Sequence, residues 1–430
     1  MTSFRRWTRR AASGLAAWAA IAAAAPAAAQ TDWAALYERL WQAVDTNFYD
    51  PHFLGTDWDA VGQTYRVRAA GVMSEAEFLD LANAMLGEIG SSHLYVSAPA
   101  ATSGRIGRTS IAARFQTMDG RRVVAEVAPL SDAWRQGLRP GHILTSEPSA
   151  LLGDIGTLAE FEVTTCEDRP LRLQARREQA FWPPEGPGFR WSTIRTGADA
   201  RLGYMRIDRF DDGAAELADQ AMAAFDDVGA IVIDLRGNSG GNVSSLRLAS
   251  YFADEPVPGV ILMSRPYLEA LGRPATPADL AAAPRIDRGY TGGAVFEAIN
   301  QHGGAAFWTE TVDTPFTGPV AVLIGPETGS AAEGFAWFMR EHTDARLIGE
   351  ETAGALLSGD RFDLGDGWSV TIPVHGLWGA DGTDYGDRAV PPHTEVTATG
   401  DDLCAGRDPV LDEAFRQAGM VGSPGSGDAP

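Results

Sequence analysis

The sequence contains no lysine, so all 35 of its basic residues are arginines. A Ser-Lys catalytic dyad is therefore excluded, because the guanidinium of arginine stays protonated at any working pH and cannot act as the base. The phosphate-binding P-loop motif is also excluded, because it requires a lysine. If a serine of this chain is activated by a general base, histidine is the natural choice, and the chain has only seven histidines.

Cysteine is also scarce, with only Cys166 and Cys404 in 430 residues. The CxxC and mixed Cys/His spacings of structural zinc sites are absent, so we expect no structural metal. Two cysteines permit a disulfide outside the cytoplasm, but their number alone does not establish one.

Long apolar runs are limited to the N-terminus. Four arginines within the first ten residues precede an alanine-rich apolar run and the sequence PAAAQ. This order is typical of a signal peptide, here residues 1–29, with cleavage after Ala29. An uncleaved anchor is the alternative, although the run is short for a membrane span. We therefore expect a periplasmic or secreted protein, exported by the Sec or the twin-arginine route.

Positive charge is scarce relative to negative charge. The formal net charge is −22, and it becomes −26 once the four arginines of the signal peptide are removed. A chain this acidic should not bind nucleic acid or anionic membranes by electrostatic attraction. After signal cleavage we expect no nucleic-acid partner and no stable membrane insertion, since no second apolar stretch approaches the roughly 20 residues of a spanning helix.

The remaining chain divides by its hydrophobic patterning. Apolar residues at helical spacing, such as Leu36, Leu40 and Val44, indicate helices at the start, and short strand-like runs follow them. Strands then alternate with helices, which argues for an α/β core with a largely parallel sheet inside a multidomain α+β chain. The predicted regions are a helical region at 30–100, a strand-rich module at 105–178, a Pro/Gly-rich linker at 179–192, an α/β core at 193–420 and a disordered tail at 421–430.

The stretch TGSAAEGFAWF, residues 328–338, places Ser330 directly after a buried strand and a turn. Taken alone, Ser330 and Glu333 form the Ser-x-x-Glu pattern of a capping box, in which the serine is an ordinary helix cap. The same serine could instead present its hydroxyl at the helix N-terminus, where the helix dipole and free N–H groups favour a developing oxyanion. This stretch alone leaves both interpretations open.

A glycine-rich turn follows another apolar strand in AIVIDLRGNSGGN, residues 230–242. Glycines such as Gly240 and Gly241 let backbone N–H groups point outward without obstruction, as an oxyanion site requires. Phosphate binding is the alternative for such a turn, but the sequence matches neither the P-loop nor GxGxxG.

These two stretches, together with RLIGEETAGA, resemble in order and spacing the core of the C-terminal-processing (tail-specific) and tricorn-core serine peptidases. The resemblance implies a ClpP/crotonase-like α/β peptidase core. In the family, the serine of the S-A-x-E motif is the nucleophile, which falls on Ser330. The backbone N–H groups of Gly240 or Gly241 and of Ala331 would then hold the oxyanion.

The strand-rich module carries a second resemblance. Its stretch VVAEVAPLSDAWRQGLRPGHILT is similar to a PDZ domain, a kind of domain that binds peptides by adding a strand to a sheet edge. A small β-module that only packs on the core is the alternative.

The peptidase family divides by the base that activates its serine. The tail-specific branch uses a lysine just after G-E-x-T-x-G, where this chain has Ala355 and Leu356. The tricorn-like branch uses the histidine of an S-H motif, which IGSSHLYV carries as Ser92 and His93. A histidine with a pKa near neutrality can accept and return the serine proton, and a third group, here Ser92, can fix its tautomer.

The acid of the family tetrad has no direct counterpart. In YGDRAVPPHTEV, Gly386 stands in the place of the family's glutamate and His393 in the place of its aspartate. A neighbouring carboxylate, Asp387 or Asp384, could substitute, and Asp387 is our candidate; the competing interpretation is a solvated loop charge. His375 is the second candidate for the base.

The sequence thus predicts an exported serine peptidase that cleaves peptides or unfolded proteins through an acyl-enzyme, with no cofactor and no metal. A periplasmic binding scaffold with a decayed site is the alternative, because the glutamate is missing. An esterase with the same nucleophile is a third interpretation. The sequence is compatible with a homo-oligomer, and it does not decide between internal and carboxyl-terminal cleavage.

Overall fold

The computed structural model describes residues 31–99, 108–178, 188–196 and 200–418. The predicted signal peptide, 1–29, and the predicted tail, 421–430, lie outside these residues. Within them, every helix is too short or too polar to span a membrane.

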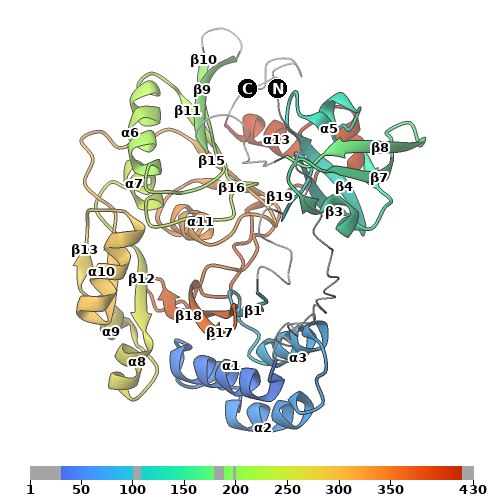
Figure 1. Ribbon diagram of the computed structural model, residues 1–430. Helices are drawn as coiled ribbons and strands as arrows, with labels where there is room; N and C mark the ends of the chain where they lie inside the picture. Colours follow the sequence, from blue (N-terminus) through green and yellow to red (C-terminus); the bar gives the residue numbers. More distant parts are fainter. Residues whose placement is uncertain (1–30, 100–107, 179–187, 197–199, 419–430) are drawn as a thin grey trace, which may run out of the picture. The chain divides into compact units, whose positions relative to one another are not determined.

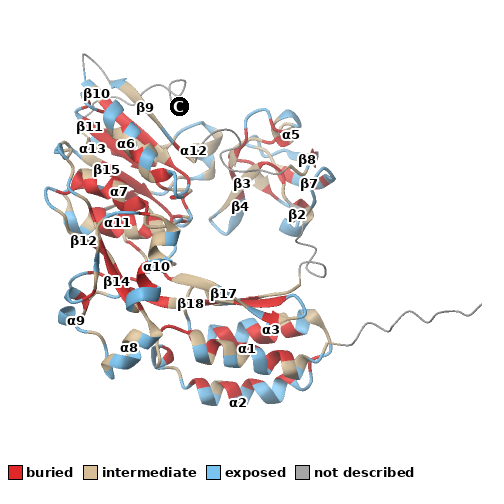
Figure 2. Cartoon of the chain, turned by 60° about the vertical axis from the view of Figure 1, so that its left-hand side comes forward, coloured by how far each residue is buried: buried red, intermediate tan, exposed pale blue. Residues whose placement is uncertain are grey.

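Helices open the described chain, as the apolar spacing predicts. Ser74 caps the N-terminus of helix α3, and its hydroxyl accepts a hydrogen bond from the Glu77 N–H at 3.3 Å. Buried residues lie along one face of each helix (Figure 2). Helix α1 packs against two strands of a later sheet. The elements are α1 (Trp33–Asn47), the 3-10 turn η1 (Phe53–Gly55), α2 (Trp58–Ala69) and α3 (Glu75–Gly87).

A five-stranded antiparallel sheet follows, with the strand order β3-β4-β5-β7-β8 and its own apolar core. The predicted strand-rich module is present, whereas its assignment as a PDZ domain stays a prediction. The elements are β2 (Arg108–Thr109), β3 (Ala113–Met118), β4 (Arg121–Val127), α5 (Asp132–Arg135), β5 (Ile143–Leu144), η2 (Pro148–Leu151), β6 (Gly153–Asp154), β7 (Leu158–Thr164) and β8 (Pro170–Arg176).

The α/β core contains a six-stranded sheet with the order β19-β16-β15-β11-β10-β9 (Figure 1). All neighbouring strands pair in parallel except β9, which is antiparallel to β10, so the largely parallel sheet is confirmed. The strands are β9 (Phe189–Thr196), β10 (Ala200–Ile207), β11 (Ala230–Asp234), β15 (Val320–Ile324), β16 (Arg346–Gly349) and β19 (Thr394–Glu395).

The predicted linker, 179–192, is wrong at its C-terminal end. Strand β9 begins at Phe189, which is 1% exposed and pairs with Ile207 of β10. The Pro/Gly-rich composition ends at Gly188, and the residues after it have the apolar spacing of a strand. The core sheet therefore begins before the predicted boundary at residue 193.

Helices cover both faces of the six-stranded sheet. Alternate residues of β11 pack on opposite faces of the sheet. Ile231 and Ile233 belong to the apolar cluster that contains α11, and Val232 belongs to the cluster that contains α13. This alternation explains why β11 is a continuous apolar run, since both of its faces are buried. The helical elements are α6 (Ala214–Ala224), α7 (Ser245–Ala249), η3 (Ser250–Phe252), α11 (Ala331–His342), α12 (Gly400–Cys404) and α13 (Pro409–Gln417).

A second six-stranded sheet has the order β1-β18-β12-β14-β13, and β17 pairs with β18. Strand β1 pairs with β18 in the register Val96 to Val370, which joins the N-terminal region to the core. The elements are β1 (Tyr95–Ser97), β12 (Pro258–Ser264), α8 (Arg265–Leu271), α9 (Pro277–Ala281), β13 (Arg285–Ile286), α10 (Gly292–His302), β14 (Gly304–Trp308), β17 (Ser358–Gly365) and β18 (Trp368–Trp378).

A disulfide joins Cys166, in the turn between β7 and β8, to Cys404 at the end of α12. The two residues are 238 positions apart in the sequence. The bond therefore cross-links the five-stranded module to the C-terminal helices.

Candidate active site

Ser330 lies at the turn between β15 and α11, with φ 51° and ψ −124°. A positive φ at a residue with a Cβ costs about 1–3 kcal/mol and persists only where the surroundings enforce it. Ser330 and Glu333 have the outline of the predicted capping box. Its serine half is weak, however, because the Glu333 N–H donates to the Ser330 backbone carbonyl at 2.8 Å and the hydroxyl makes no capping hydrogen bond. The hydroxyl is thus left for another role.

Glu333 does more than cap the helix. Its carboxylate is completely buried, which raises its pKa, and hydrogen bonds oppose that rise. It ties the start of α11 to the loop that follows β16, whose Ala355 carbonyl also accepts from the Ser330 N–H at 3.0 Å. The donors to the carboxylate are the Ser330 N–H at 3.0 Å, the Thr352 hydroxyl at 2.6 Å, the Gly354 N–H at 2.6 Å and the Ala355 N–H at 2.8 Å.

The glycine-rich turn after β11 packs directly on Ser330. Gly240 has φ +117°, and a Cβ at this position would lie 2.5 Å from the Ser330 Cβ, so no larger residue fits without displacement. The Gly240 N–H donates to the Asn238 side chain at 2.8 Å, which removes it from the predicted oxyanion donors. Within the described residues, the N–H groups of Gly241 and Ala331 make no hydrogen bond, and both residues line the cavity described below.

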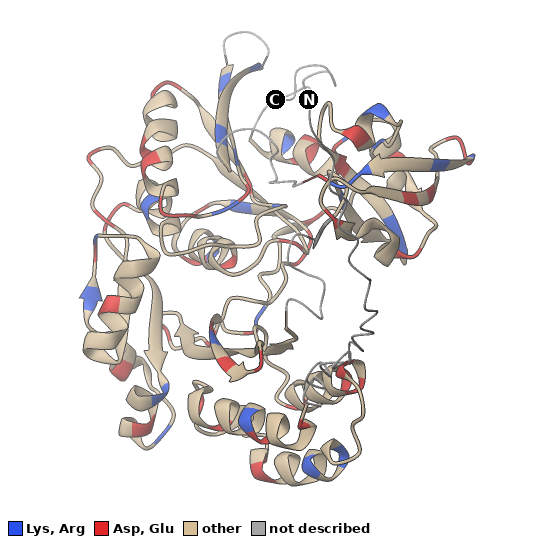
Figure 3. Ribbon diagram, viewed as in Figure 1, with Lys and Arg blue, Asp and Glu red and all other residues tan. Residues whose placement is uncertain are grey.

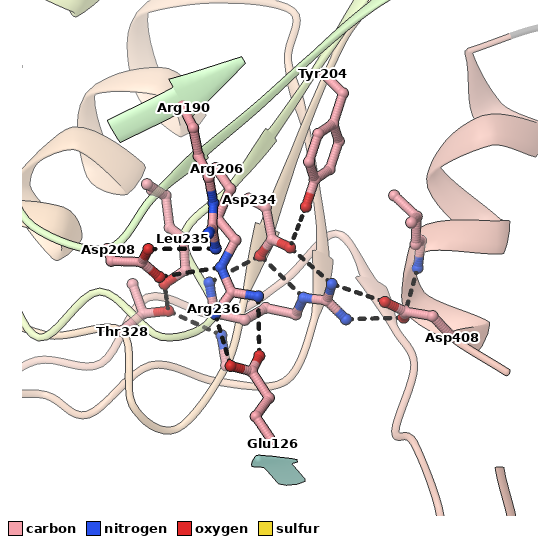
Figure 4. A network of polar contacts seen from close by, with 12 residues as sticks. Glu126, Arg190, Tyr204, Arg206, Asp208, Asp234, Leu235, Arg236, Thr328 and Asp408 are labelled. Carbon is pink, nitrogen blue, oxygen red and sulfur yellow. Dashed lines mark hydrogen bonds and ion pairs between the residues drawn. The ribbon is translucent and has the colours of Figure 1, made fainter. Parts of the chain in front are cut away.

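A buried ionic network anchors the strand that leads into this turn (Figure 4). Burial alone would raise the pKa of Asp234, the last residue of β11, but two neighbouring arginines hold that pKa well below its usual range. The network thereby fixes the backbone just before the glycines. Its contacts are Asp234 with Arg236 at 2.7 Å and with the Tyr204 hydroxyl at 2.9 Å, Arg236 with Asp408 at 2.8 Å, and Arg206 with Glu126 of the five-stranded module at 2.9 Å.

His93 is held in the loop that precedes β1. Its backbone also has a positive φ, 58°, and a Cβ at Gly359 of β17 would lie 3.2 Å from the His93 Cβ. Its Nδ1 lies 3.4 Å from the Ser92 hydroxyl. Burial lowers the pKa of His93 below its ordinary value, and the charge of Asp387 opposes this change.

Asp387 lies beside the Ser-His pair. Its Oδ1 accepts the Ser92 N–H at 2.7 Å, so it contacts the backbone of Ser92. Asp384, the other predicted carboxylate, instead accepts the Gly386 N–H at 2.9 Å, and burial raises its pKa. Of the two candidates, Asp387 is the one hydrogen-bonded to Ser92.

His393 and His375, the other two histidines near these motifs, contribute to the packing of the sheets. The His393 Nδ1 accepts the Leu347 N–H at 3.0 Å, and the His393 backbone N–H donates to the Leu347 carbonyl at 2.8 Å, so His393 extends the pairing of β16. His375 is buried in β18, and burial lowers its pKa to about 4. It is absent from the described residues that line the cavity at Ser330.

Ser330 and His93 line one cavity of about 380 Å³. No hydrogen bond joins their side chains in the described part of the chain, and such bonds are often long in unliganded sites. Most of the remaining lining is apolar or glycine, which suits a peptide side chain. The apolar lining residues are Val243, Leu246, Val260, Leu262, Val295, Phe296, Ala331, Leu356, Leu357 and Leu377.

Two features of the site are not predicted by the sequence patterns. The Asn238 side chain accepts the Gly240 N–H. An asparagine in a glycine-rich turn such as RGNSGG commonly accepts the backbone N–H two residues further along the chain. The partners of Glu333 in the loop at 352–355 are distant in sequence, so no local pattern predicts them.

Among the described residues, no group of three or more His, Cys, Asp or Glu side chains could hold a metal ion.

The chain matches two protein families. Residues 201–396 match peptidase family S41, and residues 29–87 match the tricorn protease C1 domain. The chain is 27% identical to tricorn protease homolog 2 of Streptomyces coelicolor over 90% of its own length, and 22% identical to carboxyl-terminal-processing peptidase 2, chloroplastic, of Arabidopsis thaliana over 85%. It covers 32% of the first protein and 67% of the second, so it spans about a third of the tricorn homolog.

Two solved structures share the fold. The photosystem II D1 C-terminal processing protease has a TM-score of 0.55 at 20% identity, covering 87% of this chain and 97% of that protein. Mature CPAF complexed with lactacystin has a TM-score of 0.58 at 13% identity, covering 90% and 98%. At these identities the structures establish the fold alone. Residues 201–396 are therefore similar to peptidase family S41, and the chain has tricorn proteases and carboxyl-terminal-processing peptidases as relatives.

Proposed function

We propose that this protein is an exported serine peptidase, which hydrolyses peptides or unfolded proteins through an acyl-enzyme with Ser330 as nucleophile and His93 as general base. The observation that carries the proposal is the shared cavity. Ser330 comes from the start of α11 and His93 from the loop before β1, and both line the same space. Serine needs an adjacent base to attack a carbonyl, and this chain has no lysine to supply one.

In the acylation step, the Ser330 Oγ bonds to the scissile carbonyl carbon while His93 takes the hydroxyl proton. The peptide C–N bond then breaks, and His93 gives that proton to the leaving amine. Water next attacks the ester carbonyl and loses a proton to His93, which returns it to the Ser330 oxygen as the acid product leaves. The N–H groups of Gly241 and Ala331 would stabilise the oxyanion in both steps.

Ser92 and Asp387 would orient the base. Ser92 places its hydroxyl near the Nδ1 of His93, and Asp387 holds the Ser92 backbone. Asp387 would thus replace the missing glutamate indirectly, through Ser92. Because burial lowers the pKa of His93, its ring is neutral and able to accept a proton at neutral pH.

Export is supported by the N-terminal sequence pattern and by the disulfide between Cys166 and Cys404, since such bonds persist in oxidising compartments. The proposed destination is the periplasm or the medium.

A second candidate is a peptide-binding scaffold with an inactive site. It is favoured by the missing glutamate and by the lack of a hydrogen bond between Ser330 and His93 within the described residues. Such a protein would bind peptides in the same cavity without cleaving them.

Hydrolysis of a peptide library by the mature protein tests the proposal. We expect cleavage by the wild type and a loss of roughly a thousandfold or more in kcat/KM for both Ser330→Ala and His93→Ala. Ser92→Ala should give a smaller loss, since Ser92 acts through His93. Equal activity of wild type and Ser330→Ala would refute the assignment, and an inert wild type that binds peptides would favour the scaffold.

A further inference from the structure

Arg209 lies in the loop between β10 and α6 and lines the cavity that contains Ser330. The backbone next to Arg209 is anchored at Phe210, whose N–H donates to the Gly240 carbonyl at 3.0 Å and whose carbonyl accepts the Asn242 N–H at 2.8 Å. The loop is therefore paired with the turn that carries the proposed oxyanion donor. Arg209 stands one residue from this pairing.

Arg209 brings a positive charge to a cavity whose lining is otherwise mostly apolar or glycine. Acidic residues occur throughout the described fold (Figure 3), and the whole chain has 57 of them. Yet Arg209 carries the one permanent charge among the described residues that line the cavity, and no carboxylate lines it. Within the described chain, the Arg209 guanidinium forms no ion pair and no hydrogen bond.

The carboxylates next to Arg209 in the sequence all have other partners. Asp208 pairs with Arg206 at 3.0 Å and Arg190 at 3.6 Å. Asp211 accepts the Gly213 N–H at 3.0 Å. Asp212 accepts the Gly292 N–H at 3.1 Å and the side chain of Asn242 at 2.5 Å. Three acidic neighbours are thus occupied, and Arg209 is left unpaired at the edge of an apolar cavity.

We propose that Arg209 binds a carboxylate of the peptide substrate next to the scissile bond. This inference rests on the proposed peptidase function, and it specifies a substrate that combines an apolar side chain with a carboxylate. The carboxylate could belong to the C-terminus of the peptide or to an Asp or Glu side chain. Both offer the same planar pair of oxygens, which a guanidinium binds through two parallel hydrogen bonds.

The test uses three peptides with one common apolar sequence: a neutral peptide with an amidated C-terminus, the same peptide with a free C-terminus, and the amidated peptide with one Asp. Binding to Ser330→Ala and to Ser330→Ala combined with Arg209→Gln is measured first, because it does not require turnover. We expect the carboxylate peptides to bind about tenfold tighter than the neutral one, and this preference to vanish with Arg209→Gln.

The same three peptides are then used to compare kcat/KM of the wild type and Arg209→Gln, both with Ser330 intact. For the carboxylate peptides, Arg209→Gln should mainly raise KM. Arg172→Gln is the matched control, since it removes an equal charge from an 80% exposed side chain on β8 and should keep the preference. Which peptide is preferred identifies the source of the carboxylate. Equal binding of all three peptides, or a preference that survives Arg209→Gln, would overturn the inference. Selective binding without hydrolysis would instead count against the proposed peptidase activity while retaining the role of Arg209.

Discussion

At the scale of single residues, the two proposed catalytic side chains share a backbone feature. Ser330 and His93 both have a positive φ, 51° and 58°, although neither is a glycine. Strained residues of this kind cluster at active sites, where the surroundings enforce a geometry that the chain would otherwise avoid. Such strain cannot be inferred from residue type, since serine and histidine commonly adopt negative φ. The sequence predicted the two residues but not the conformations that present them.

The surroundings of His93 predict the pH dependence of hydrolysis. A base must be neutral, so kcat/KM should be lost as pH falls through the pKa of His93. Burial lowers this pKa from 6.5, so the midpoint of the acid limb should lie below 6.5. The Asp387 charge favours the protonated ring, and Asp387→Asn should therefore move the midpoint to still lower pH.

The pH profiles of kcat/KM for the wild type, Asp387→Asn and Asp384→Asn measure these midpoints. Asp384→Asn is the control, because Asp384 bonds Gly386 rather than Ser92. A midpoint that rises in Asp387→Asn would contradict the proposed placement of this carboxylate.

At the scale of elements, the start of α11 shows how far a local pattern reaches. The Ser-x-x-Glu pattern correctly predicts where the helix begins, because a capping box depends on residues three apart. It does not reveal that Glu333 also binds the loop at 352–355, since those partners are brought close by the sheet. One buried carboxylate therefore joins the turn that carries Ser330 to the loop beside the cavity.

Replacing Glu333 by glutamine tests this role. An amide would set its own N–H groups against buried N–H donors and leave some of them unpaired, so we expect a loss of about 3 kcal/mol in the free energy of unfolding, together with reduced kcat. Urea unfolding and peptide hydrolysis measure the two effects. Glu351→Gln is the control, because Glu351 is exposed in the adjacent loop and should change stability by less than about 0.5 kcal/mol. Equal stability of the two variants would contradict the account.

At the scale of the whole chain, the sequence predicted the parts whose signals are local. These were the N-terminal helices, the strand-rich module and the parallel sheet, whose buried strands are continuous apolar runs. The second six-stranded sheet was missed, because it is assembled from segments far apart, such as β1 and β18. That pairing also carries the loop of His93 to the core, so the meeting of His93 and Ser330 in one cavity had to come from family resemblance rather than from spacing.

The disulfide joins two residues that are far apart in the sequence, and its contribution to stability can be measured. Cross-linking residues 238 positions apart restricts the unfolded chain, which should stabilise the protein by about 4 kcal/mol. We expect Cys166→Ser combined with Cys404→Ser to lower the free energy of urea unfolding by that amount. A reducing agent should lower the wild type to the level of this variant and leave the variant unchanged. Equal stability of oxidised wild type and variant would show that the bond contributes nothing.

The central claim, that Ser330 is a nucleophile activated by His93, is tested most directly by mapping the adduct of a fluorophosphonate on the intact protein by mass spectrometry. The account predicts a single modified peptide carrying the label on Ser330, no label in Ser330→Ala, and labelling at least tenfold slower in His93→Gln. Labelling that persists in Ser330→Ala, or that proceeds at the wild-type rate in His93→Gln, would contradict it.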